Sequence, residues 1–418
     1  MKSHSLSKKG RRLLLAPVGA AAALLLLALT GCSPDAGGSP EPADDSPIVI
    51  GGTLGLTGIY SGPSAAYKIT YEHWADDVNE AGGIMGRDVE LILYDDESNP
   101  TVAQQLYQQL INEDEADILL APYTTAVGGS IVPITERAGM LVVNAGFVAK
   151  ELHGKSELLV STWPYQESEY SLPLFSYFDS LPDDQKPKTL AVITAQNPFT
   201  LVARSGVDGE GGVVNYAKER GIEIVVDEEY DQTATDLSSL IQRVKQSGAD
   251  ALVALSLPND AALIAKTVYD NDYTPDFYCQ CGSQVTSLPN WPDNGAAAVN
   301  VFSTAGTWLT QPNPGLQEFA DYILGELDVP VLPAYAATAY AAGQVIQQSI
   351  EGTKSLDSQT LREYIGANTF DTVAGKLKYA ADGTVDFAAL LVQYQEGGNE
   401  LIWPIDQATA DAVIPYRN

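Results

Sequence analysis

The chain has 418 residues and a formal net charge of −31, with 54 Asp and Glu residues against 23 Lys and Arg residues. Its length suits two domains or lobes of roughly 150–200 residues each. Phosphate groups are bound by clustered Lys and Arg, so a surface this acidic repels nucleic acid and anionic lipid headgroups. We therefore expect a globular protein that has no nucleic-acid partner.

The first 31 residues have the three parts of an export signal. Basic residues occur up to Arg12, an apolar segment runs from Leu13 to Leu29, and a small residue precedes Cys32. This end resembles the lipobox of bacterial lipoproteins, which implies that Cys32 becomes the lipidated N-terminus. An uncleaved membrane anchor is the competing interpretation, although the apolar run is short for a membrane span and contains Pro17 and Gly19.

Residues 32–47 are rich in Pro, Gly, Ser and acidic residues and contain little that a core could bury. This composition predicts a disordered spacer. No later segment is apolar for long enough to predict a second membrane span. We therefore expect the remaining chain to be held on the extracytoplasmic side of the cell membrane by lipid on Cys32.

The first predicted elements are a strand over residues 47–56, a glycine-rich loop that contains Tyr60, and a helix. Large apolar residues at helical spacing predict a core-facing stripe, formed by Tyr67, Tyr71, Trp74 and Val78. Gly82 and Gly83 then predict the end of this helix, because glycine readily adopts positive φ. Apolar positions from Asp88 onward predict a strand that ends in the acidic loop at Asp95 and Asp96.

Strands and helices alternate through the middle of the chain, which predicts an α/β fold with parallel sheets and right-handed crossovers. Further strands are predicted over residues 117–121, 140–143, 188–194, 221–226, 249–255 and 277–281, and strand-like runs recur after residue 377. Cys279 and Cys281 are one residue apart, which does not suit an ordinary disulfide and offers too few ligands for zinc. We expect free thiols and no metal site.

Several motifs together resemble the branched-chain amino acid (leucine/isoleucine/valine) binding proteins of ABC importers, which have the type I periplasmic binding protein fold. The motifs are IVIGGTLGLTG, VNEAGGIMGRDVELILYDDESNP, LLAPYTT, TERAGMLVV and ATDLSSLIQRVKQSGADALVAL. The resemblance extends from about Ile48 to about Trp403. It implies two Rossmann-like lobes joined by three crossovers, with residues 48–165 and 301–375 in one lobe and residues 166–300 and 376–418 in the other.

The same resemblance implies a monomer that captures a small ligand between its lobes and presents it to a membrane permease, without catalysis or a cofactor. In this family the loop after the third strand binds the ligand's carboxylate, and here it contains Tyr123, Thr124 and Thr125. Hydroxyl groups at a helix N-terminus suit an anion. The alternative is that Thr124 or Thr125 only caps the following helix, and both roles are compatible.

The remaining candidate ligand residues also come from the resemblance. They are Tyr60, Asn144, Ala145, Gly146, Phe199, Leu257, Gln280 and Trp308. Tyr60 and Trp308 are candidates for aromatic walls, and a core position is the alternative for Trp308. Phe199 stands where a tyrosine is usual, so it would cover the ligand without a hydrogen bond.

Gln280 is the largest departure from the pattern, because many amino acid binders place a glutamate there for the ligand's ammonium group. Burying an ammonium group without a carboxylate is costly. Asp95, Asp96 and Asp260 are alternative partners for an ammonium group. The ligand is therefore expected to be an amino acid, an amide, or an aromatic or aliphatic carboxylate.

Two functions other than an importer receptor are compatible with a secreted protein of this size. A secreted hydrolase is disfavoured, because only His73 and His153 follow the export signal and neither G-x-S-x-G nor H-E-x-x-H occurs. A sensor that signals to a membrane kinase would use the same fold, and the sequence does not separate it from an importer receptor.

Overall fold

The computed structural model describes residues 46–148, 150–163, 166–282, 284–288, 290–329, 332–333, 335–385 and 389–417. The chain divides into two units, residues 1–44 and residues 45–418. The predicted export signal, Cys32 and all but the last two residues of the predicted spacer lie outside the described residues. Within the described residues, no helix combines the length and apolar character that crossing a membrane requires.

The first half of the described chain forms a parallel sheet whose strands lie in the order β2-β1-β3-β4-β5. Its strands are β1 (Ile48–Leu54), β2 (Val89–Asp95), β3 (Ile118–Leu120), β4 (Val142–Asn144) and β5 (Leu159–Ser161). Residues of β1, β3, β4 and β5 are almost all buried, as expected for a sheet covered by helices on both faces.

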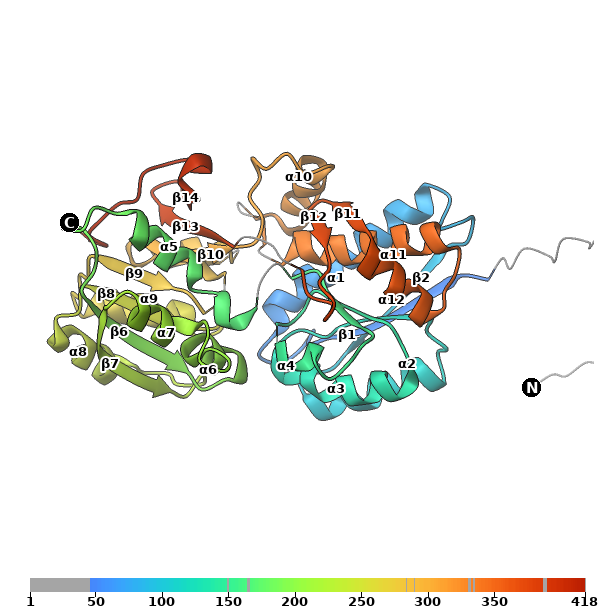
Figure 1. The fold of residues 1–418 in the computed structure, drawn as a ribbon, viewed down its shortest axis with the longest axis horizontal. Coiled ribbons are helices and arrows are strands. Elements are labelled where there is room, and N and C mark those ends of the chain that lie inside the picture. Colours follow the sequence, from blue (N-terminus) through green and yellow to red (C-terminus); the bar gives the residue numbers. More distant parts are fainter. Residues whose placement is uncertain are drawn as a thin grey trace, which may run out of the picture. The chain divides into compact units, whose positions relative to one another are not determined.

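The helices around this sheet come from both ends of the chain (Figure 1). They are α1 (Ser61–Glu80), α2 (Pro100–Asn112), α3 (Thr125–Ala138), α4 (Lys150–His153), α10 (Leu316–Leu327), α11 (Ala336–Thr353) and α12 (Ser358–Ala367). The predicted apolar stripe of α1 is confirmed, because Tyr67, Tyr71, Trp74 and Val78 are all buried. Helix α11 packs closely on α1, since a Cβ atom at Gly343 would lie 2.2 Å from the Trp74 ring.

The predicted helix-turn-strand unit at residues 79–96 is also confirmed. Gly82 and Gly83 have φ values of 101° and 76° just after α1, and β2 follows at Val89. A Cβ atom at Gly83 would lie 2.2 Å from the carbonyl oxygen of Arg87, so the turn requires glycine there for space as well as for φ.

The second half forms a sheet in the order β14-β13-β10-β9-β8-β6-β7. Its strands are β6 (Thr189–Ala195), β7 (Glu223–Tyr230), β8 (Ala251–Leu255), β9 (Phe277–Gln280), β10 (Val301–Ala305), β13 (Leu390–Gln395) and β14 (Gly398–Trp403). Its helices are α5 (Leu172–Ser180), α6 (Pro198–Ser205), α7 (Gly212–Glu219), α8 (Ser238–Ser247) and α9 (Ala261–Asp270). Pairing is parallel from β7 to β10 and antiparallel at β13 and β14.

The chain passes between the two halves three times, which matches the predicted three crossovers and confirms the predicted fold class. The passages run from β5 to α5, from β10 to α10, and from residue 385 to β13. Two predicted lobe boundaries need correction. Residues 301–305 belong to the second half, because β10 pairs with β9 and β13.

The return to the second half also comes later than the predicted residue 376. Strand β12 (Gly375–Lys378) pairs with β11 (Thr369–Thr372), and Leu377, Tyr379 and Val385 pack in the hydrophobic core of the first half. The backbone N–H of Ser161 at the end of β5 also donates to the carbonyl of Gly383, at 2.8 Å. The earlier boundary at residue 165 lies outside the described residues.

The expectation of free thiols is wrong, because Cys279 and Cys281 form a disulfide. Alternate residues of an extended segment point to the same face. The two Cα atoms are 5.4 Å apart, within the usual range for a disulfide. Both residues are buried against the core of the second half.

Candidate ligand-binding site

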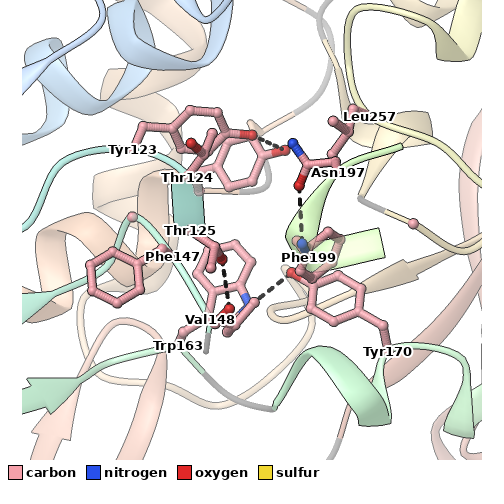
Figure 2. A pocket seen from close by; sticks show the side chains of 13 residues that line it. Tyr123, Thr124, Thr125, Phe147, Val148, Trp163, Tyr170, Asn197, Phe199 and Leu257 are labelled. Carbon is pink, nitrogen blue, oxygen red and sulfur yellow. Dashed lines mark hydrogen bonds between the residues drawn. The ribbon is translucent and has the colours of Figure 1, made fainter. Parts of the chain in front are cut away.

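A cavity of about 50 Å³ lies where loops from both sheets meet. Its lining comes mainly from segments that follow β3, β4, β5, β6, β8 and β9, the carboxyl ends of parallel strands. The lining residues are Tyr123, Thr124, Thr125, Gly146, Phe147, Val148, Trp163, Tyr170, Asn197, Phe199, Leu257, Gly282 and Tyr335. Figure 2 shows Tyr123, Thr124 and Trp163 facing Asn197, Phe199 and Leu257 across this space.

The N-terminus of α3 forms one wall of the cavity. Thr124 precedes the helix at a φ of 75°, and its side chain makes no capping hydrogen bond. Thr124 Oγ1 is buried near the Tyr60 hydroxyl but makes no hydrogen bond of normal geometry within the described residues. Thr125 Oγ1 instead donates to the carbonyl oxygen of Val148 at 2.7 Å. The predicted capping role is therefore absent for Thr124.

Asn144 holds the neighbouring loop in place from within the core. Its Oδ1 accepts hydrogen bonds from the backbone N–H groups of Gly146 (2.9 Å) and Phe147 (3.0 Å). Its Nδ2 donates to the Phe147 carbonyl and to Ser161 Oγ. Gly146 is needed for the close approach of two loops, because a Cβ atom there would lie 2.3 Å from the Pro122 carbonyl oxygen.

Aromatic side chains from distant parts of the chain form much of the wall. Trp163 stacks on Tyr335 with ring centroids 5.6 Å apart, and its Nε1 donates to the hydroxyl of Tyr170 at 2.8 Å. Tyr170 in turn meets Phe199 edge to face at 4.8 Å. Tyr123 contacts Tyr335 at 5.4 Å, and their hydroxyl groups are 3.3 Å apart. The result is a wall of packed rings.

The second half contributes residues whose polar groups are already bonded. Asn197 Oδ1 accepts from the backbone N–H of Phe199 at 3.0 Å, which caps α6, and its Nδ2 donates to Gln232. The backbone N–H of Leu257 donates to Asp260 Oδ1 at 2.7 Å. This side of the cavity therefore offers mainly apolar surface from Phe199 and Leu257.

None of the described lining residues has a side chain that is charged at neutral pH. Burial raises the pKa of Tyr123 well above its ordinary value, so this hydroxyl stays protonated. Burial also raises the pKa of Tyr60, an effect that the nearby Thr124 and Asn197 side chains partly offset. Among the described residues, no group of three or more His, Cys, Asp or Glu side chains is arranged to hold a metal ion.

Six predicted ligand residues line this cavity: Tyr123, Thr124, Thr125, Gly146, Phe199 and Leu257. Tyr60 lies directly behind it and meets the Tyr123 ring edge to face at 5.6 Å. Asn144 and Ala145 lie in the supporting layer, where the Ala145 carbonyl accepts from the Tyr67 hydroxyl. Their predicted contact with a ligand remains a prediction.

Gln280 and Trp308 are placed away from the cavity. Gln280 is fully buried, and its amide bonds Ser256 Oγ, the Ala261 carbonyl and the Tyr278 hydroxyl. Trp308 packs beside a small apolar cluster and lines a different cavity of about 530 Å³. The predicted aromatic-wall role of Trp308 therefore does not apply to the smaller cavity.

The three aspartates proposed as alternative partners for an ammonium group are engaged elsewhere. Asp96 accepts from Thr53 Oγ1 at 2.8 Å and from the Ser98 backbone N–H at 2.9 Å. Asp95 bonds Thr57. Asp260 Oδ2 accepts from the Tyr230 hydroxyl at 2.7 Å, and none of the three carboxylates lines the cavity.

Seven lining residues were not predicted: Phe147, Val148, Trp163, Tyr170, Asn197, Gly282 and Tyr335. Phe147, Val148, Asn197 and Gly282 lie in loops that follow predicted strands, so naming every residue at those strand ends as a candidate includes them. Trp163 follows the short strand β5, which was not predicted. No local pattern distinguishes Tyr170 or Tyr335 from core tyrosines.

A protein-family model described as "Periplasmic binding protein" matches residues 47–399. Leu/Ile/Val-binding protein homolog 7 of Brucella abortus (strain 2308) is 23% identical over 411 residues, covering 93% of this chain and 99% of that protein. These matches confirm the family resemblance that the sequence motifs indicated.

Solved structures of similar fold include two with different ligands. The substrate-binding protein of a branched-chain amino acid transporter from Streptococcus pneumoniae, in complex with isoleucine, has a TM-score of 0.72 and 18% identity, over 88% of this chain and 100% of that chain. A solute-binding protein from R. palustris, in complex with 4-hydroxybenzoate, has a TM-score of 0.73 and 18% identity, and the match covers 88% of this chain and 98% of that chain. These structures establish the similarity in fold.

Proposed function

This chain belongs to the periplasmic binding protein family, and we propose that it is a solute receptor that captures a small ligand and delivers it to an ABC importer. The ligand would be a branched-chain amino acid or a related amide or carboxylate. The observation that carries this proposal is the cavity formed by loops of both sheets at the carboxyl ends of parallel strands. Catalysis forms no part of it.

Capture would depend on movement between the two halves. The cavity takes Thr124 and Trp163 from the first half and Phe199 and Leu257 from the second, with three chain passages connecting the halves. A ligand that contacts both walls favours the arrangement in which they are close, so binding becomes a change of shape. The permease would recognise that shape.

The names of similar proteins support a small organic ligand and leave its class open. The relative from Brucella abortus is named for leucine, isoleucine and valine, and the structure from Streptococcus pneumoniae contains isoleucine. The R. palustris protein of similar fold was solved with 4-hydroxybenzoate. Side chains in the cavity must therefore decide which ligand this chain takes.

We propose in addition that lipid on Cys32 anchors the protein at the extracytoplasmic face of the cell membrane. The basic residues, the apolar segment and the small residue before Cys32 support this location. A Cys32→Ala variant should leave the membrane fraction while wild type stays in it. Equal membrane retention of both proteins would favour an uncleaved apolar anchor.

The receptor function is tested by identifying what the protein carries and whether cells need the protein to take that compound up. Small molecules released when the purified protein is unfolded are identified by mass spectrometry. Uptake of the labelled compound is then compared in cells with the gene, without it, and with the gene restored. We expect uptake to fall without the gene and to recover with it. Unchanged uptake would contradict the delivery role.

A further inference from the structure

We propose that the ligand is a small aromatic carboxylate that lacks an ammonium group. This inference rests on the proposed receptor function, because it specifies what the cavity receives. It narrows a range of amino acids, amides and carboxylates to one chemical class. Three features of the described lining residues support it: the absence among them of a counter-charge for an ammonium group, the abundance of aromatic rings, and a wall suited to an anion.

An ammonium group would have no ionic partner in the described lining. Two buried carboxylates lie within three residues of lining positions in sequence, Asp260 after Leu257 and Glu167 before Tyr170. Both oxygens of Asp260 accept hydrogen bonds, from the Leu257 backbone N–H and the Tyr230 hydroxyl. Glu167 Oε2 accepts from the backbone N–H of Lys150. Both carboxylates therefore accept hydrogen bonds from groups of the protein itself.

The residue at the position where many amino acid binders have a glutamate cannot replace that carboxylate. Gln280 is an amide, and it is fully buried. Its Oε1 accepts from Ser256 Oγ at 2.7 Å, and its Nε2 donates to the Ala261 carbonyl at 2.9 Å and to the Tyr278 hydroxyl at 2.7 Å. Burying an α-amino acid here would leave its ammonium group without charge compensation, which strongly disfavours that class.

The apolar part of the lining is mainly aromatic. Tyr123, Trp163, Tyr170, Phe199 and Tyr335 contribute rings, and neighbouring centroids are 4.8–5.6 Å apart. Aromatic pairs favour stacked and edge-to-face contacts at such separations, so another flat ring fits this environment well. Valine and leucine supply the aliphatic part of the lining at only two positions. A ring is therefore favoured over a branched aliphatic chain.

The α3 wall suits a carboxylate. The first N–H groups of a helix have no partner within the helix, and the helix dipole favours negative charge there. Thr124 Oγ1 is buried beside this end without a hydrogen bond of normal geometry. Thr125 Oγ1 already donates to Val148, so Thr124 supplies the hydroxyl donor that can turn to an anion. A carboxylate would accept from these groups, whereas the NH₂ of an amide would need acceptors.

Matched ligand pairs test this proposal by titration calorimetry on the purified protein. 3-Phenylpropanoate and L-phenylalanine differ by the ammonium group, benzoate and cyclohexanecarboxylate differ in aromaticity, and benzoate and benzamide differ in charge. L-leucine and 4-methylpentanoate complete the set. We expect the aromatic carboxylates to bind at least about 100-fold more tightly than L-phenylalanine or L-leucine.

The outcomes separate this inference from the receptor function. If L-leucine or L-phenylalanine binds as tightly as its partner without the ammonium group, the inference fails and the receptor function stands. Equal binding of benzoate and benzamide, or of benzoate and cyclohexanecarboxylate, also overturns the stated class. If no member of the set binds, the inference fails, and the compound released on unfolding decides the receptor function.

A substitution at the anion wall adds a test within the protein. Thr124→Val keeps the side-chain shape and removes the hydroxyl, so affinity for benzoate should fall about tenfold while affinity for benzamide changes less. The matched control is Thr135→Val within α3, where a buried hydroxyl donates to the Val132 carbonyl away from the cavity. Equal loss for both ligands in Thr124→Val would show that the hydroxyl does not recognise charge.

Discussion

The two walls of the cavity differ in how their polar groups are used. On the α3 side, the Thr124 hydroxyl is buried without a hydrogen bond of normal geometry at the start of a helix. Across from it, the amide of Asn197 is occupied by hydrogen bonds within the second half. The comparison indicates that one wall recognises the polar end of a ligand, while the other covers it with apolar surface.

This difference also predicts which substitutions affect folding and which affect binding. Asn144 and Gln280 resemble each other, because each is a fully buried amide whose hydrogen bonds all go to other groups of the protein. Thr124 and Phe199 face the space directly. We therefore expect losses of stability at the first two positions and losses of affinity at the second two.

The largest effect is expected for Asn144→Ala. Removing the amide leaves the backbone N–H groups of Gly146 and Phe147 buried without their acceptor. Each such group costs about 1–3 kcal/mol, so the free energy of unfolding should fall by about 4 kcal/mol. Urea unfolding measures the change. The control is Asn112→Ala at an exposed position of α2, which should change stability by less than about 0.5 kcal/mol. A similarly small loss at Asn144 would show that its network does not hold the α3 wall.

The second prediction concerns Asp260, which lies beneath the opposite wall. Burial raises its pKa from 3.8 to about 6. The folded protein then binds more protons than the unfolded chain between these values, so the free energy of unfolding falls as pH rises through this window. A shift of about two pKa units corresponds to about 3 kcal/mol.

Asp260→Asn should remove this pH dependence, because an amide oxygen can still accept from the Leu257 backbone N–H. Urea unfolding between about pH 4 and 7 gives the free energy of unfolding of the variant and of wild type, and the difference between the two should change with pH. Asp184→Asn, at an exposed position, is the control for the change in total charge. A difference that does not vary with pH would contradict the role assigned to Asp260.

Local patterns were sufficient to predict an α/β fold with parallel sheets, and the family resemblance added much of the α3 wall. Glycines at positions 82 and 83, apolar strands and polar loops act within a few residues, so their structural effect can be read along the chain. Tyr123, Thr124 and Thr125 were predicted from the family resemblance, in which the loop after the third strand binds the ligand's carboxylate, and all three line the cavity.

The remaining lining depended on contacts that no local pattern records. Trp163 and Tyr335 stack although they are 172 residues apart, and Tyr170 joins them through a hydrogen bond to Trp163. Gln280 lies at the end of a predicted strand, but its orientation depends on Ser256, which follows β8, and on Ala261 in α9. The boundary at residue 301 was wrong for the same reason. Strand β10 belongs to the second half because it pairs with β9 and β13, and the sequence does not record that pairing.

A smaller loss of stability is expected for Gln280→Glu, which restores the glutamate typical of many amino acid binders. The new carboxyl group would replace the Nε2 donor that the Ala261 carbonyl and the Tyr278 hydroxyl now share. We expect a loss of about 2 kcal/mol in urea unfolding and no gain in L-leucine affinity. Gln105→Glu on the exposed face of α2 is the control. Tight L-leucine binding by Gln280→Glu would show that this side chain reaches the ligand.

The smallest effect is expected for Phe199→Ala, which should lower the affinity for the ligand. Phe199 covers the cavity beside Tyr170 and offers no hydrogen bond to a ligand, so its loss should weaken charged and neutral aromatic ligands alike. We expect about a tenfold loss of affinity in calorimetry, which corresponds to about 1.4 kcal/mol. Phe319→Ala truncates a similar buried ring away from the cavity and should lower stability without changing affinity. If Phe199→Ala weakened benzoate far more than benzamide, recognition of charge would extend to the second wall and the contrast between the walls would fail.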